Sequence, residues 1–118
     1  MTVVDRLSSS RGKRSKEANK VLAKDIADSE DYNSINGLIN LLSDKNKTIQ
    51  SDSIEVLYEL GYIKPELLEQ HEKVFLYLLE SKNNRLVWGA MIALSSISSV
   101  NPQSVFKSLT KITKAINR

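Results

Sequence analysis

Apolar residues recur at helical spacing through most of the chain, and short polar runs separate the apolar segments. The clearest segment places Ile35, Leu38, Ile39 and Leu42 at positions i, i+3, i+4 and i+7. This spacing puts all four side chains on one face and predicts a helix of about ten residues. The polar residues 43–47 that follow predict a turn.

A second apolar segment follows this turn. It is marked by Ile49, Ser53, Leu57 and Leu60, and it predicts a second helix over residues 48–60. Gly61 stands where a left-handed cap would end that helix. Pro65 then predicts the first turn of a new short helix.

The residues before this hairpin predict a capping helix and an arm. Ala18, Val21, Leu22 and Ile26 fall at helical spacing, so we expect a helix over residues 16–28. Residues 1–15 are polar, basic and without periodicity. They are interpreted as a flexible basic arm, and residues 16–118 as one helical domain.

The pattern then repeats with a period of 37 residues. A shift of residues 38–68 by 37 gives residues 75–105, and six of the 31 aligned positions are identical. The identical pairs are Leu41/Leu78, Leu42/Leu79, Lys45/Lys82, Asn46/Asn83, Leu57/Leu94 and Pro65/Pro102. Ile112, Ala115 and Ile116 predict the start of a third copy. Because turn, core and proline positions recur together, the pattern indicates stacked helical pairs.

The unit resembles the HEAT/armadillo family of α-solenoid repeats. The resemblance lies in residues 41–50 and 78–87, which look like the end of a first helix, a polar turn and the start of a second helix. It implies an all-α fold, a right-handed superhelix of about two and a half helical hairpins with an N-terminal capping helix. The family often opens its second helix with Val-Arg, whereas this chain has Ile49-Gln50 and Leu86-Val87. Members serve mostly as protein-binding scaffolds, and some bind nucleic acid.

Composition removes several kinds of chemistry. The chain has no cysteine, which excludes disulfides and thiolate metal ligands. His71 is its single histidine, so a histidine-based metal site lacks further ligands. Glu55 and Glu59 are interpreted as solvated carboxylates on one outer helix face. No phosphate-binding loop or nucleophile motif is present, and we expect no enzymatic activity, cofactor or small-molecule substrate.

Charge is distributed unevenly along the chain. Residues 25–80 carry twelve acids and four bases, whereas residues 81–118 carry six bases and no acid. No apolar run approaches the ~18 residues of a membrane span, and the N-terminus lacks a signal-peptide core. The sequence therefore predicts a cytoplasmic protein without membrane association.

Trp88 breaks the repeat, since its counterpart 37 residues earlier is Ser51. A core position is expected to stay apolar in both copies, so Trp88 is expected to be partly exposed or to face the groove that the second helices, 48–60 and 85–97, would line in the family arrangement. Arg85 lies on the same face and Asn84 one turn back. Tryptophan and arginine are enriched at binding hot spots, so these three residues form a candidate partner site. The alternative is that Trp88 packs across the repeat interface.

A basic stripe marks the last predicted helix. Lys107, Lys111, Lys114 and Arg118 follow each other at spacings of 4, 3 and 4. The stripe is open to three interpretations: a solvated cap, a docking surface for an acidic protein, or a set of phosphate contacts. We expect another protein as the partner of this chain. Self-association and nucleic-acid binding through the stripe and the basic arm are the alternatives.

Overall fold

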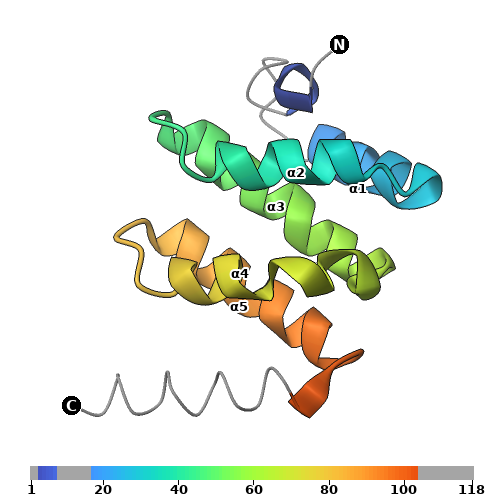
Figure 1. Ribbon diagram of the computed structural model, residues 1–118. Coiled ribbons are helices and arrows are strands. Elements are labelled where there is room, and N and C mark those ends of the chain that lie inside the picture. Colours follow the sequence, from blue (N-terminus) through green and yellow to red (C-terminus); the bar gives the residue numbers. More distant parts are fainter. Residues whose placement is uncertain (1–2, 8–16, 104–118) are drawn as a thin grey trace.

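The computed structural model describes residues 3–7 and 17–103, and every regular element in these ranges is helical (Figure 1). The elements are η1 (Val3–Arg6), α1 (Glu17–Ser29), α2 (Tyr32–Leu41), α3 (Lys47–Ile63), η2 (Pro65–His71), α4 (Glu72–Leu78) and α5 (Asn84–Ser98). Those labelled η are 3-10 helices. The all-α prediction is therefore confirmed for the part of the chain that the structure describes.

The two hairpins form two layers: α2, η2 and α4 make up one, and α3 and α5 make up the other. α3 is the central helix. α3 packs against α1, α2 and α5, and α4 packs against α5. In Figure 1, α2 and the η2–α4 segment run across the front, and α3 and α5 pass behind them. Two hairpins, α2–α3 and η2/α4–α5, thus lie side by side, and α1 covers a further face of α3.

The turns that open α3 and α5 share one hydrogen-bond pattern. The side chains of Asp44 and Ser81, 37 residues apart, accept from the backbone N–H of Asn46 (2.8 Å) and Asn83 (3.0 Å), respectively. Each asparagine then uses its Oδ1 to accept from the N–H two positions further on, at 2.9 Å and 3.1 Å. These bonds satisfy N–H groups that have no partner within the helix. The 37-residue period therefore recurs in atomic contacts as well as in residue types.

One amide contact joins the two hairpins. Asn83 donates from Nδ2 to Gln50 Oε1 at 3.0 Å, while Gln50 Nε2 donates to the carbonyl oxygen of Asp44. A neutral amide bridge thus links the units at this position.

The core runs continuously through both layers. Its largest fully buried side chains include Ile35 and Leu38 of α2, Leu57 of α3, Phe75 of α4 and Leu94 of α5. Each comes from the apolar face of an amphipathic helix, so burying these faces against one another holds the hairpins together.

Two expectations at the end of α3 need correction. Gly61 does not cap the helix: α3 continues to Ile63, and Lys64 is its C-cap. Gly61 is buried, and a Cβ added there would lie 2.9 Å from Ser96 Oγ and 3.1 Å from Leu68 Cδ1. The absence of a side chain at Gly61 therefore lets α3 lie close to α5 and η2. The short helix after Pro65 is present, but as 3-10 helix η2, which runs into α4.

The N-terminal residues are partly packed. The predicted capping helix is α1, and residues 3–7 of the predicted arm also contact the helices: η1 packs on α1 and α2, and Leu7 is fully buried. Arg6 forms an ion pair with Asp25 of α1. The rest of the predicted arm and the third copy around Ile112 lie outside the described residues.

Candidate functional site

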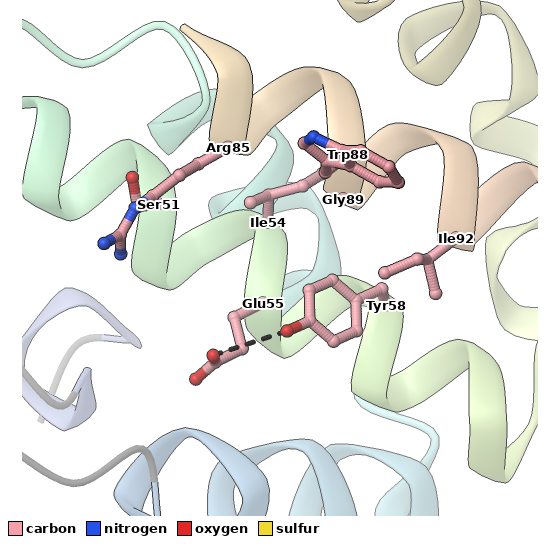
Figure 2. A pocket seen from close by; sticks show the side chains of 8 residues that line it. All are labelled: Ser51, Ile54, Glu55, Tyr58, Arg85, Trp88, Gly89 and Ile92. Atoms are coloured by element: carbon pink, nitrogen blue, oxygen red, sulfur yellow. Dashed lines mark hydrogen bonds between the residues drawn. The ribbon is translucent and has the colours of Figure 1, made fainter.

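A groove runs between α3 and α5 on the outer side of their layer. Its floor is the contact between Ile54 and Gly89, where a Cβ added to the glycine would lie only 2.4 Å from Ile54 Cγ1. The absent side chain lets the two helices approach closely there. The groove is lined by Ser51, Ile54, Glu55, Tyr58, Arg85, Trp88, Gly89 and Ile92 (Figure 2).

Trp88 forms part of the α5 wall and is 66% exposed. Its counterpart on α3, Ser51, is small and turns its hydroxyl back to donate to the carbonyl oxygen of Lys47 at 2.9 Å. Trp88 thus borders the groove between the two hairpins and is mostly exposed there.

Arg85 lies one turn before Trp88 on the same helix and is exposed. Its side chain extends across the end of the groove toward Ser51, as Figure 2 shows. The structure thus brings Arg85 and Trp88, two of the residues singled out by the sequence, to one groove. The third, Asn84, lines an adjoining hollow.

The adjoining hollow is polar and carries two cationic side chains. It is lined by Lys47, Thr48, Ser51, Asn83, Asn84 and Arg85, at the points where α3 and α5 begin. Ser51 and Arg85 line both the hollow and the groove, which makes the two continuous. In residues 3–7 and 17–103, neither Lys47 nor Arg85 forms an ion pair. This end of the groove therefore carries uncompensated positive charge.

Tyr58 forms the opposite wall and has an altered proton affinity. Burial, followed by the nearby charges of Glu55 and Glu59, raises the pKa of the Tyr58 hydroxyl to about 12. The hydroxyl donates to Glu55 Oε2 at 3.4 Å, and the ring meets that of Tyr62 edge-on, with centroids 6.1 Å apart. At neutral pH the hydroxyl is thus a donor, and the ring is held in place.

Glu55 is not the freely solvated carboxylate that its spacing from Glu59 indicated. It is partly buried, and besides the Tyr58 hydroxyl it accepts from Asn19 Nδ2 of α1 at 2.8 Å. The same Nδ2 donates to the buried Asp52 at 3.0 Å. In Figure 2 the carboxylate points away from Trp88. Glu55 therefore helps to tie α3 to α1.

The basic stripe at Lys107, Lys111, Lys114 and Arg118 lies outside the described residues. The stripe is therefore not included in the candidate site. Four features of the site were not predicted from the sequence: the Gln50–Asn83 bridge, the Tyr58 wall, the close approach at Gly89 and the cation at Lys47. The glycine did leave a signal, since it stands 37 residues after Asp52, where the first copy of the repeat has a side chain.

The fold and the groove define an all-helical protein with an aromatic–cationic surface. Comparison with family models, with curated proteins and with solved structures finds no match for this chain. Among the described residues, no group of three or more His, Asp and Glu side chains is arranged to hold a metal ion. The described helices include none with the length and apolar character needed to cross a membrane.

Proposed function

We propose that this chain is a non-catalytic protein-interaction module that binds its partner in the groove between α3 and α5. The observation that carries the proposal is the exposed Trp88 beside Arg85 at the edge of that groove. Covering an aromatic side chain removes roughly 150 Å² from water, worth ~4 kcal/mol at about 25 cal/mol per Å² before the costs of association. One such side chain can therefore dominate a small interface.

We further propose that the two hairpins are HEAT-like units that follow a right-handed superhelix. The repeated turn at Asn46 and Asn83 supports this arrangement, as does the side-by-side placement of the hairpins. In such an array the second helix of each pair lines the concave side. α3 and α5 are the second helices of the two hairpins, so in such an array the groove between them would lie on the concave side, where helical-repeat scaffolds bind.

The test is a comparison of two aromatic truncations in affinity capture from extracts of the source cells. Trp88→Ala removes the proposed anchor. Tyr77→Ala is the matched control, because Tyr77 is 76% exposed and belongs to α4 in the other layer. Both truncations are expected to change stability by less than about 0.5 kcal/mol, since the side chains are mostly exposed.

The expected result is a partner that the wild-type chain and the Tyr77→Ala variant retain and that the Trp88→Ala variant loses. Circular dichroism melting of all three proteins verifies that the fold persists. Retention of every captured protein by a folded Trp88→Ala variant would rule out the groove as the binding site.

A further inference from the structure

The groove separates positive charge from apolar surface along its length. Lys47 and Arg85 lie at the end where α3 and α5 begin, and Trp88, Tyr58 and Ile92 lie beyond them. The starts of two helices add positive potential to the cationic end. A ligand that matches the groove therefore carries negative charge at one end and apolar surface at the other.

The length of the groove limits the size of such a ligand. Arg85 and Ile92 are seven residues apart on α5, which at 1.5 Å per residue corresponds to about 10 Å along the helix. An extended chain advances about 3.3 Å per residue, so roughly three residues span this distance. A short linear segment is therefore sufficient to reach from the cationic end to the far apolar wall.

Acidic residues on the α3 wall determine which end of the groove can receive the negative charge of the ligand. Glu55 lines the groove beside Tyr58, and both Glu55 and Glu59 raise the pKa of the Tyr58 hydroxyl. A carboxylate placed next to Tyr58 would be repelled, whereas one placed between Lys47 and Arg85 would be attracted. The same repulsion opposes a nucleic-acid backbone, whose phosphates would carry negative charge along the full groove.

Resting on the proposed function, we propose that the partner presents a short linear peptide segment with an acidic residue followed or preceded by an apolar one. The carboxylate binds between Lys47 and Arg85, and the apolar side chain packs on Trp88 over the Ile54–Gly89 floor. Charge complementarity selects the segment, and burial of the indole supplies most of its affinity.

The experiment uses the full chain as bait for a phage-displayed library of random linear peptides. Enriched peptides are expected to share an Asp or Glu within about three residues of an aromatic or large aliphatic residue. One enriched peptide is then synthesised, and its binding is followed through Trp88, the single tryptophan of the chain. Covering the indole is expected to shift its emission to shorter wavelength.

Charge reversal gives the decisive comparison. Arg85→Glu is expected to weaken the peptide at least ~10-fold, because an attraction becomes a repulsion. Lys73→Glu is the matched control, since Lys73 is exposed on α4 in the other layer, and it is expected to change the Kd less than about two-fold. A peptide with Lys in place of its acid is expected to regain affinity for the Arg85→Glu variant.

The outcomes separate this inference from the function on which it rests. Enriched peptides that depend on Trp88 but lack an acid, or that bind Arg85→Glu as tightly as wild type, overturn the acidic-segment proposal alone. Enrichment of no peptide likewise overturns the acidic-segment proposal alone, whereas binding that ignores Trp88→Ala overturns both. A dimer in light scattering that Trp88→Ala dissociates would identify a second copy as the occupant and would also overturn the proposal of a separate acidic partner.

Discussion

α3 and α5 are the same helix of the repeat, 37 residues apart, and they differ only on some of their faces. Both begin after an asparagine cap, and both bury the leucine of the aligned pair Leu57/Leu94. One turn earlier, at the aligned pair Ile54/Met91, the burial of the side chains differs: Ile54 is 2% exposed, whereas Met91 is 50% exposed. The difference follows from neighbours, since α5 itself covers Ile54.

The divergence extends to the groove. Ser51 on α3 corresponds to Trp88 on α5, and buried Asp52 corresponds to Gly89. The buried pairs Leu57/Leu94 and Leu60/Ile97 stay apolar in both copies. Positions that face a different neighbour, or none, have changed. In a repeat protein, residue differences between copies thus indicate the surfaces where the copies have different neighbours or different functions.

The largest expected effect concerns the shared core position. Leu57→Ala and Leu94→Ala each remove a fully buried side chain, and each is expected to lower the free energy of unfolding by about 2–5 kcal/mol. Leu57→Ala should cost more, because α3 packs against α1, α2, α5 and η2, whereas α5 packs against α3, α4 and η2. Urea unfolding followed by circular dichroism measures both. If either substitution lowered the free energy of unfolding by less than truncation of an exposed side chain does, the two leucines would not be equivalent core positions.

The next effect concerns the floor of the groove. Gly89→Ala is expected to destabilise the protein by about 1–3 kcal/mol, because the new Cβ would overlap Ile54. In an Ile54→Ala background the same substitution should cost much less, since only the contact with the Cβ of residue 54 at 3.3 Å remains. Alanine also favours helix over glycine by up to about 1 kcal/mol. Thermal unfolding of the four proteins forms a double-mutant cycle. Additive effects would show that the two residues do not meet.

A smaller effect compares the two caps. Asn46→Ala is expected to cost about 1 kcal/mol through loss of the α3 cap. Asn83→Ala removes the equivalent cap and also the bond to Gln50, so it should cost about 0.5–1.5 kcal/mol more. Adding Gln50→Ala to each variant tests the source of the excess. If both asparagine substitutions lowered the free energy of unfolding equally, the hydrogen bond between Asn83 and Gln50 would not contribute to stability.

The smallest effect is a titration. The raised pKa of Tyr58 means that the folded protein holds this proton more tightly than the unfolded chain does. The resulting contribution to stability is fully present below pH 10 and is lost as the pH rises through about 12. Absorbance at about 295 nm is expected to show one of the four tyrosines titrating late. Tyr58→Phe should remove that late step, and a late step that persists would assign it to another tyrosine.

Much of this fold was predictable because its signals are local. Apolar spacing placed α2, α3 and α5 within a few residues, and the period of 37 identified the equivalent turns. Gly61 was misassigned because its role depends on Ser96 and Leu68, which lie on other elements. Glu55 was misread for the same reason, as its partner Asn19 belongs to α1.

The candidate site was partly predictable as well. The repeat identified Trp88 as an exception, and Arg85 and Asn84 followed from helix geometry. Tyr58 could not be added from periodicity, since its role in the groove arises from the packing of α3 against α5. Lys47 could not be added from periodicity either, because the starts of α3 and α5 are distant in sequence and come together only in the folded protein.

The amide bridge between the hairpins has a consequence for building longer arrays. Gln50 receives the side chain of Asn83, but the residue that corresponds to Gln50 in the next unit is Val87, which offers no oxygen from its side chain. Tandem copies of residues 44–80 would present a glutamine to the asparagine of every following copy. Such a designed polymer would be joined by uncharged links, and its joints should tolerate concentrated salt that weakens charged ones.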